Sequence, residues 1–228
     1  MSSEGSTPGL GVAHDDAAKP WETQRRGMLL LVSSPSGAGK TSLSRRLVSD
    51  HSDLILSIST TTRPPRPGEE EGREYFFKDR PAFQAMIQAG DLLEWAEING
   101  NLYGTPKAPV MAALEAGKDV LFDIDWQGAR QVAEATPQDV IRVFVLPPSW
   151  RDLSRRLHAR AQDSEAVIGQ RLALGKREIA HWADYDYVIV NKDFDRAYAD
   201  LGHIYRAERM KPGRNPWLPA FVTGLAEE

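Results

Sequence analysis

The residues best suited to chemistry lie in a glycine-rich turn, Ser34–Thr41, which follows an apolar run. Gly37 and Gly39 let backbone N–H groups turn inward around an anion, and a helix starting at Lys40 adds the positive end of its dipole. In this pattern the lysine reaches the β- and γ-phosphates of a nucleotide, and the hydroxyl of Thr41 holds Mg²⁺. The turn therefore predicts a loop that binds a triphosphate.

One position departs from the usual pattern, because Ser34 stands where the first glycine is expected. The alternative interpretation is an ordinary strand–turn–helix segment that binds nothing. We favour the binding interpretation, for which the expected contacts of the triphosphate are Ser34, Pro35, Ser36, Gly37, Ala38, Gly39, Lys40 and Thr41.

The composition is typical of a cytoplasmic globular protein. The chain has 228 residues, 41% of them hydrophobic, which allows one large domain or a core with inserted subdomains. It has no cysteine, which excludes disulfides and thiolate metal sites, and its net charge of -4 is unlike that of nucleic-acid binders. No apolar run approaches the roughly 18 to 20 residues that span a bilayer. Residues 1–26 lack the apolar core of a secretory signal, so we expect a disordered extension.

The centre of the chain alternates strand and helix patterns. Apolar runs predict strands buried on both faces at Met28–Val32, Asp119–Ile124, Val140–Leu146 and Tyr187–Val190. Pro106 and Gly117 bracket one helix between them. Apolar stripes mark two further helices, at Leu153, Leu157, Ile168, Leu172 and Ile179. The alternation predicts an α/β domain with a parallel sheet.

Residues 58–105 predict a mixed, largely antiparallel insert. Short strands are expected at Ser57–Thr62, Glu74–Phe77 and Leu92–Ile98. Asn99-Gly100 is a strong hairpin-turn signal, and Asp79 is the expected N-cap of a helix between the last two strands. A second segment, 149–171, is helical and rich in arginine, and the three prolines of Lys211–Glu228 predict a poorly ordered tail.

The insert opens with a stiff cationic loop, in which prolines hold Arg63 and Arg66 three residues apart beside several hydroxyls. Such a loop suits bidentate binding of a phosphate monoester. The alternatives are a solvated basic turn or a proline-rich motif for a protein partner.

Taken together, these segments resemble the guanylate kinase family. The matching stretches occur in family order between residues 27 and 208: Pro35–Thr41, Ser59–Glu69, Glu94–Ala96, Tyr103–Thr105, Asp123–Gly128 and Val190–Asn191. The resemblance implies an α/β fold, the three-layer sandwich of P-loop NTPases with a parallel core sheet, an inserted mixed α+β GMP-binding subdomain and a helical lid. The implied limits are an extension at 1–26, the domain at 27–210 and a tail at 211–228. Within the domain the core is 27–57, 106–148 and 172–210, the insert is 58–105 and the lid is 149–171.

The resemblance also implies how GMP is bound. Arg63, Arg66, Tyr75 and Tyr103 match positions that hold the GMP phosphate, and Glu69 belongs to the same loop. Ser59 and Thr105 match donors to guanine O6 and N7, and Glu94 and Asp125 match acceptors for guanine N1–H and the 2-amino group. A carboxylate only accepts hydrogen bonds, so AMP would leave it desolvated and unpaired. The alternatives are a solvated edge-strand role for Glu94 and plain packing roles for the two tyrosines.

Two aspartates have competing interpretations. Asp123 ends an apolar strand, where an acid positions Mg²⁺ through water beside a phosphate-binding loop; it also belongs to the set expected around GMP. Its alternative is the N-cap of a helix over Trp126–Ala135, for which Asp125 is better spaced.

The arginine-rich segment resembles the family's lid, in which Arg156, Arg160 and Arg171 match residues that close over the ATP phosphates. Arg151 and Arg155 are expected to be solvated. Ala161 replaces a glycine common at this point in the family, which leaves the conformation of the lid tip open. Asn191 matches a residue that contacts adenine.

The sequence thus predicts an ATP:GMP phosphotransferase that uses Mg²⁺ and also accepts dGMP, with Lys40, Arg66, Arg160 and Arg171 as catalytic residues. Direct in-line transfer is expected, because no nucleophile–base pair is evident. We expect no nucleic-acid or membrane partner, and the oligomeric state stays open. Two alternatives are a non-catalytic peptide-binding relative, usually marked by a damaged phosphate loop, and a kinase for a ribose phosphate, which should lack the Glu94/Asp125 pair.

Overall fold

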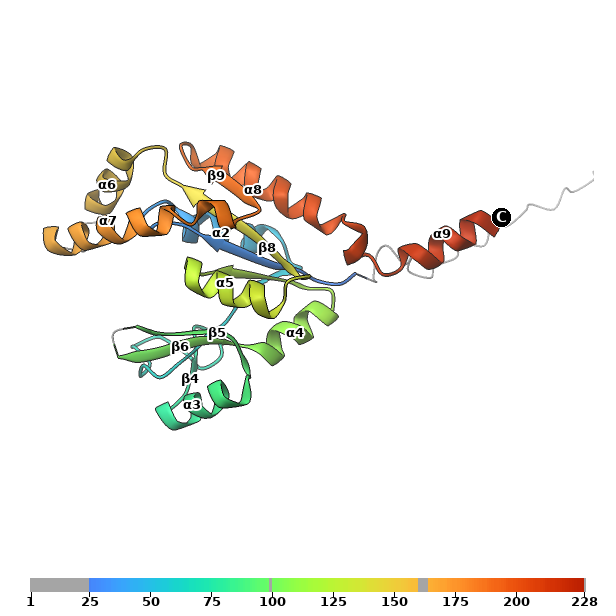
Figure 1. Cartoon of the computed structure of the whole chain (residues 1–228), viewed down its shortest axis with the longest axis horizontal. Coiled ribbons are helices and arrows are strands. Elements are labelled where there is room, and N and C mark those ends of the chain that lie inside the picture. Colours follow the sequence, from blue (N-terminus) through green and yellow to red (C-terminus); the bar gives the residue numbers. More distant parts are fainter. Residues whose placement is uncertain (1–24, 99, 160–163, 228) are drawn as a thin grey trace, which may run out of the picture.

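The computed structural model describes residues 25–98, 100–159 and 164–227. These residues form a central body with an insert on one side, a helical lid at one end and a helix that projects from the opposite end (Figure 1). Almost all of the predicted N-terminal extension, together with Asn99, Arg160 and Ala161, lies outside the described residues. Among the described residues, no helix has both the length and the apolar character needed to cross a membrane.

The central sheet has five parallel strands in the order β2-β7-β1-β8-β9. Their bounds are β1 (Leu29–Ser33), β2 (Leu54–Leu56), β7 (Asp119–Asp123), β8 (Val140–Leu146) and β9 (Tyr187–Val190). The four strands predicted from the sequence are confirmed to within one residue at each end. The expectation that all four are buried on both faces was wrong for β9, because it is an edge strand in which Val188 and Val190 are exposed. The short edge strand β2 was not predicted, because Ile55 and Leu56 are exposed and only Leu54 is buried.

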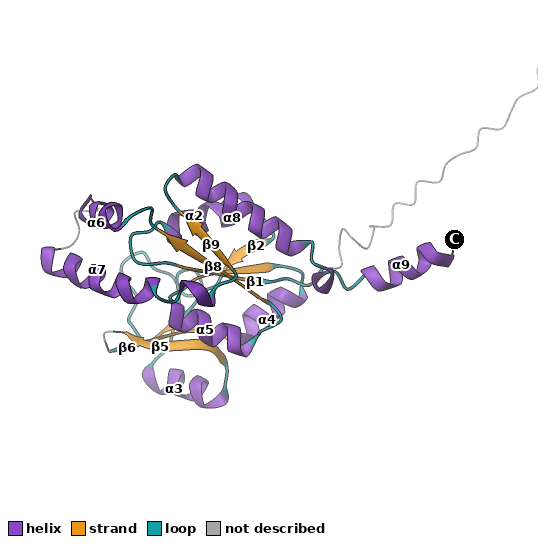
Figure 2. Cartoon of the chain, turned by 45° about the horizontal axis from the view of Figure 1, so that its top comes forward, coloured by secondary structure: helices purple, strands orange, loops and turns teal. Residues whose placement is uncertain are grey.

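Helices cover both faces of this sheet, which gives three layers (Figure 2). Leu30 and Val32 of β1 pack with α2 (Lys40–Asp50) and α8 (Phe194–Arg209) on one face. Leu29 and Leu31 pack with α4 (Lys107–Glu115) and α5 (Trp126–Ala135) on the other. Because β1 is covered on both faces, its residues are apolar from Leu29 to Val32. The loop that follows β1 therefore begins directly at the end of a buried strand.

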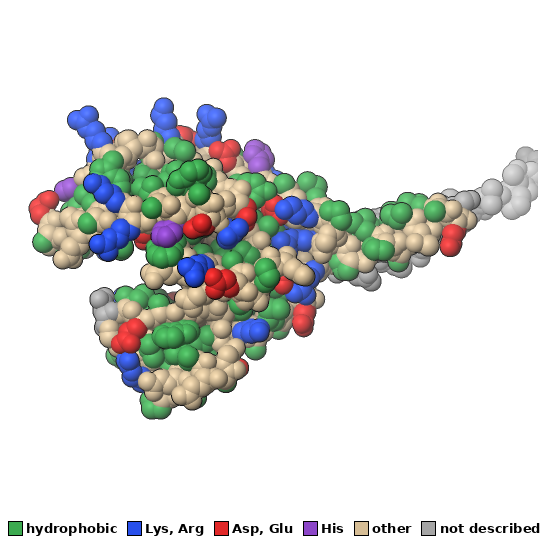
Figure 3. Space-filling model, in the orientation of Figure 1, with side chains coloured by type: hydrophobic (Ala, Val, Ile, Leu, Met, Phe, Trp, Pro, Cys, Tyr) green, Lys and Arg blue, Asp and Glu red, His purple; other side chains and the backbone are tan. Residues whose placement is uncertain are grey.

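The insert is built on a second, four-stranded sheet in the order β4-β3-β6-β5. The strands are β3 (Thr60–Thr61), β4 (Phe76–Phe77), β5 (Leu92–Ile98) and β6 (Asn101–Pro106), and only the β3–β4 pair is parallel. The predicted cap is confirmed, because the Asp79 carboxylate accepts a hydrogen bond from Ala82 N–H at the start of α3 (Arg80–Ala89). A deep notch separates the insert from the lid (Figure 3), whereas the insert joins the body where Trp95 of β5 exchanges hydrogen bonds with Gln131 of α5.

The lid consists of α6 (Trp150–Ala159) and α7 (Glu165–Ile179). The predicted apolar stripe is buried at Leu153, Leu157 and Ile168. The helix α7 runs without a break past residue 171, the limit expected for the lid, and ends at Ile179. A short 3₁₀ turn, η1 (Trp182–Asp184), then leads into β9.

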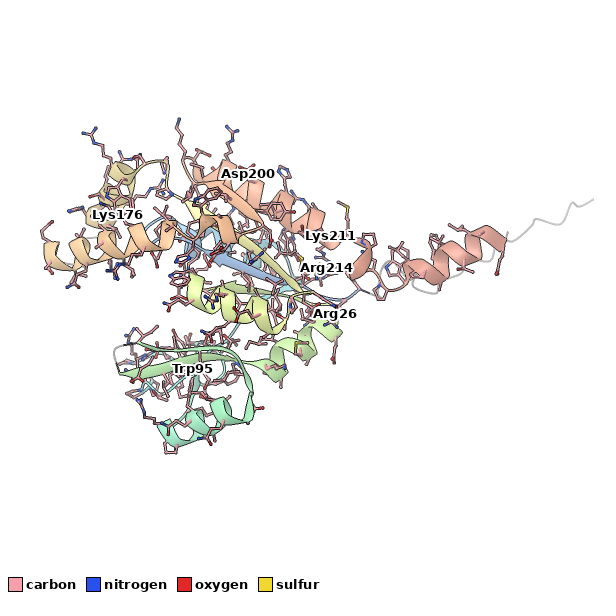
Figure 4. All side chains as sticks on the ribbon, in the orientation of Figure 1. Arg26, Trp95, Lys176, Asp200, Lys211 and Arg214 are labelled. Carbon is pink, nitrogen blue, oxygen red and sulfur yellow. The ribbon has the colours of Figure 1, made fainter. Side chains whose placement is uncertain are left out.

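Residues 25 and 26 are anchored to the core, which corrects the expectation that the extension continues to residue 26. The Arg25 guanidinium donates to both carboxylate oxygens of Asp119 at 2.8 Å, and Arg26 donates to Asp139 at 2.8 and 2.6 Å. The Arg26 N–H also donates to the Arg214 carbonyl oxygen, so the start of the fold lies at the base of the projecting helix (Figure 4). These charged partners are distant in sequence, so the local composition did not reveal them.

The prediction of a poorly ordered C-terminal tail was wrong for the described residues. Pro212–Arg214 form a 3₁₀ turn, η2, and Leu218–Glu227 form the helix α9. The prolines are compatible with this structure because Pro219 lies in the first turn of α9, where a missing N–H breaks no helical hydrogen bond.

Candidate active site

Two adjoining hollows flank the loop that follows β1. The first, called the phosphate cavity here, has a volume of ≈ 230 Å³ and is lined by Ser34, Ser36, Gly37, Gly39, Lys40, Thr41, Asp123, Asp125 and Glu178. The second, the outer cavity, has a volume of ≈ 520 Å³ and is lined by Gly37, Gly39, Ser42, Arg156, Ala159, Asn191, Lys192, Asp193 and Phe194. Both share Gly37 and Gly39, so one elongated ligand can occupy them together.

The loop has the backbone conformation of an anion-binding turn. Gly37 and Gly39 have φ angles of 94° and 104°, in the left-handed region that side chains disfavour. A Cβ atom on Gly39 would lie 2.3 Å from Asn191 Nδ2, so this position also has no room for a side chain. The helix α2 begins at Lys40 with Gly39 as its N-cap and no capping side chain among the described residues. Its first N–H groups and dipole are therefore available to an anion.

Lys40 is held at the end of β7 by two oxygens. Its ammonium lies 2.8 Å from Asp123 Oδ1 and donates to the Ile124 carbonyl oxygen at 2.8 Å. Both side chains are mostly buried, at 17% and 24% exposure, so water screens the pair only in part. Lys40, Thr41 and Asp123, which the sequence predicted to lie close together, line one cavity.

The oxygens present fit a divalent cation such as Mg²⁺. The Thr41 hydroxyl and the Asp123 carboxylate are hard ligands that line the same cavity. No group of three or more His, Cys, Asp or Glu side chains among the described residues could hold a metal by itself. A cation here would take its remaining ligands from water and from the phosphates, as Mg²⁺ commonly does.

Asp125 caps α5, because its Oδ1 accepts a hydrogen bond from Gly128 N–H at 2.9 Å. The competition between Asp123 and Asp125 for the cap is thus resolved in favour of Asp125. The cap uses one carboxylate oxygen, and Asp125 also lines the phosphate cavity. A base-binding role and the capping role are therefore compatible.

Glu94 is buried, at 9% exposure, which contradicts the alternative of a solvated edge-strand carboxylate. Its Oε1 accepts a hydrogen bond from the Thr105 hydroxyl at 2.7 Å, and Ser59 Oγ lies 3.5 Å from Thr105 Oγ1. Burial raises the pKa of Glu94, the charge of Asp125 raises it further, and the hydrogen bond from Thr105 opposes both. The insert therefore presents a costly buried carboxylate toward the core, as expected of a site that selects hydrogen-bond donors.

The cationic loop of the insert is ordered by Glu69. The Arg63 guanidinium donates to both Glu69 carboxylate oxygens at 2.9 Å, and Glu69 Oε2 also accepts from Arg66 N–H at 2.8 Å. The Arg66 N–H lowers the pKa of Glu69, with Arg63 adding to the effect. Glu69 thus fixes the Arg63 side chain and the backbone at Arg66, a positioning role that its predicted place among the substrate contacts did not specify.

The aromatic side chains expected at this loop are also brought together. The Arg63 guanidinium lies 5.4 Å from the centre of the Tyr75 ring, and the Tyr75 and Tyr103 rings are 6.1 Å apart. Packing and phosphate contact are compatible here, because a phenol can pack by its ring and donate by its hydroxyl.

The lid joins the phosphate loop through Arg156 and Asn191. Arg156 donates to the Asn191 and Ala38 carbonyl oxygens at 2.9 and 3.3 Å, and Asn191 Nδ2 donates to the Ala38 carbonyl oxygen at 2.7 Å. Both residues line the outer cavity. Arg171 lies on α7 and is partly buried, whereas Arg160 and Ala161 lie outside the described residues.

Sequence reasoning missed Glu178, which lines the phosphate cavity from α7. Burial raises its pKa, and the Ser36 N–H and the Lys40 charge oppose that rise. The available signal was its spacing, because Glu178 follows Arg171 by seven residues and so lies on the same face of α7. Lys192 and Phe194, in the outer cavity, were missed as well.

The sequence model of the guanylate kinase family matches residues 26–208 of this chain. A guanylate kinase from Caulobacter vibrioides is 60% identical over 203 residues, which cover 89% of this chain and 95% of the relative. One from Nitrobacter winogradskyi is 55% identical over 205 residues, covering 90% and 94%. Among solved structures, the guanylate kinase from Anaplasma phagocytophilum matches with a TM-score of 0.69 and 35% identity, covering 88% of this chain and 95% of that one.

Proposed function

Because the chain belongs to the guanylate kinase family and is an ATP:GMP phosphotransferase, we propose which of its residues bind each substrate and how the transfer proceeds. The observation that carries this assignment is the buried Glu94–Thr105 pair of the insert, because Glu94 lies against the start of α5 and feels the charge of Asp125, which itself lines the phosphate cavity. The guanine base of GMP, bound by these carboxylates, and the triphosphate of ATP, bound in the phosphate cavity, would then lie next to each other.

The donor site consists of the phosphate cavity and the outer cavity. The loop Ser34–Thr41 surrounds the phosphates with N–H groups, and Lys40 leaves its contacts with β7 to neutralise them. Arg156 and Asn191 lie in the outer cavity, where the adenosine would extend. Thr41, and Asp123 through water, would hold Mg²⁺, which neutralises phosphate charge when it is bound.

The acceptor site lies on the insert. Arg63, Arg66, Tyr75 and Tyr103 bind the GMP phosphate, with Glu69 holding the Arg63 side chain and the backbone of Arg66. Glu94 and Asp125 accept hydrogen bonds from guanine N1–H and the 2-amino group, while Ser59 and Thr105 donate to O6 and N7. These contacts read the base rather than the ribose, so dGMP is a substrate as well.

Transfer is a direct in-line displacement on the γ-phosphorus. The reaction needs charge neutralisation more than covalent chemistry, and Lys40, Arg160 and Arg171 supply it while Arg66 holds the acceptor phosphate in line. The notch between insert and lid allows both modules to close, which excludes water and suppresses ATP hydrolysis. The intact phosphate loop argues against a non-catalytic binding role, and we propose that the enzyme acts in the cytoplasm.

The test of substrate choice is a coupled assay for ADP formation with GMP, dGMP, AMP, UMP and CMP. We expect turnover with GMP and dGMP and little with the other three. A preference for AMP or a pyrimidine nucleotide would overturn the assignment of the acceptor site. Lys40→Met should abolish turnover and leave the thermal unfolding transition in place, because the Lys40 side chain lies in the cavity rather than in the core. Near-normal turnover in that variant would contradict the donor site.

A further inference from the structure

The helix α7 packs directly against the phosphate loop. A Cβ atom on the buried Gly175 would lie 3.4 Å from Pro35 Cβ and 3.5 Å from the Trp150 ring, so α7 approaches the loop closely at this turn. Figure 4 marks the helix by Lys176, the next residue along the chain. Glu178 follows within one turn and is thereby brought to the wall of the phosphate cavity.

The Glu178 carboxylate is stabilised by the same groups that are expected to bind a phosphate in the loop. The backbone N–H of Ser36 and the charge of Lys40 both act on it and lower its pKa, against the larger rise caused by burial. Its Oε2 is buried and has no hydrogen-bond partner among the described residues. A buried carboxylate without full compensation is costly, and neither the core packing nor the assigned substrate contacts account for it.

Glu178 lies on the acceptor side of the cavity. It lines the phosphate cavity together with Asp125, an expected contact of the acceptor base, whereas Arg156 and Asn191 line the outer cavity on the other side of the loop. The terminal phosphate of the donor must lie nearest the acceptor because it is the group transferred. The terminal phosphate is therefore the part of ATP that meets Glu178.

We propose that Glu178 is a resident anion of the donor site, whose carboxylate interacts with the Ser36 N–H and the Lys40 charge until the terminal phosphate of ATP displaces it. This inference rests on the proposed donor site. It makes Glu178 a determinant of donor affinity that acts on triphosphates and spares diphosphates, since ADP lacks the γ-phosphate that would occupy the place of the Glu178 carboxylate. ADP would therefore inhibit ATP binding more strongly than it would in a site without the Glu178 carboxylate.

The test is the change Glu178→Gln, with ATP and ADP binding measured by titration calorimetry in one Mg²⁺ buffer. Glutamine keeps the size of the side chain and an oxygen that can accept from Ser36 N–H, and it removes the charge. We expect ATP to bind about three- to tenfold more tightly than in the wild type, with ADP affinity changed by less than about twofold. Glu165→Gln is the matched control, because Glu165 is exposed at the other end of α7 and should alter neither affinity.

Loss of affinity for ATP, or an equal change for ATP and ADP, would overturn the proposal. Glu178→Ala should shift the ATP-to-ADP affinity ratio in the same direction. It is the variant to measure if Glu178→Gln does not fold. The donor site itself is tested separately, because wild-type protein must bind ATP and Lys40→Met must weaken that binding. A wild type that fails to bind ATP refutes the donor site, whereas a normal wild type with an unchanged ratio in Glu178→Gln refutes only the resident anion.

Discussion

Replacing Glu94 by glutamine tests whether the buried carboxylate selects guanine. The side chain is only 9% exposed, and one of its oxygens already accepts from Thr105 at 2.7 Å. A Cβ atom on Gly128 would lie 3.4 Å from the other oxygen, which places that oxygen at the start of α5, beside Asp125. The substitution keeps the shape of the group, removes its charge and turns one acceptor into a donor.

The expected loss follows from the number and kind of hydrogen bonds. A hydrogen bond to a charged group contributes about 1.5–3 kcal/mol, and the glutamine amide would also face a guanine donor with its own N–H groups. A loss of about 2–3 kcal/mol corresponds to a fall of about 30- to 150-fold in kcat/KM for GMP. AMP loses no such bond, so the GMP-to-AMP selectivity should fall by about the same factor.

The assay is kcat/KM for GMP and for AMP, measured with the wild type and two variants. Glu97→Gln is the control because Glu97 lies on the same strand, β5, but is half exposed and pairs with Arg80 on the surface. A selectivity ratio in Glu94→Gln within about threefold of the wild type would refute the base-reading role. An equal loss in Glu97→Gln would trace the effect to the strand rather than to the buried carboxylate.

Three further predictions concern stability and the loop. Burial raises the pKa of Glu94 above its ordinary value of 4.5, so the ionised form costs stability above that pH; Glu94→Gln should therefore gain thermal stability over the wild type between pH 5 and pH 7.5. Gly39→Ala should cost about 1–3 kcal/mol and weaken ATP binding, because φ is 104° and the new Cβ would displace the Asn191 amide, as thermal unfolding and calorimetry would show. Asp119→Asn should cost about 3–5 kcal/mol in urea unfolding, because the fully buried carboxylate accepts from Arg25, Tyr205 and a backbone N–H.

Each of these has a matched comparison. The pH effect would be contradicted by a stability difference that shrinks from pH 5 to pH 7.5. Gly90→Ala has a similar left-handed φ of 71° and no atom of the described residues within 4 Å, so it should lose stability and leave ATP binding intact. Asp195→Asn removes an exposed ion pair with Arg46 and should lower the free energy of unfolding by less than about 1 kcal/mol. If Asp119→Asn lowered it by no more than Asp195→Asn does, burial would not determine the cost.

Local patterns were sufficient where a short segment dictates its own structure. The caps at Asp79 and Asp125 and the bounds of β8 and β9 follow from residues within a few positions of each other. Local reasoning failed at β2, an exposed edge strand, and at α9, because the three prolines of the segment were interpreted as a sign of disorder although only Pro219 lies in the helix, in its first turn.

The sequence by itself determined the kind of chemistry, because Gly37, Gly39, Lys40 and Thr41 can form their loop from neighbouring residues alone. Only the tertiary structure decided which charges meet across the chain. Glu69 orders the arginine loop, and Glu178, more than 130 residues after Lys40, lies at the same cavity. The physical reason is that burial and charge act through space, whereas hydrophobic periodicity and turn signals act along the chain.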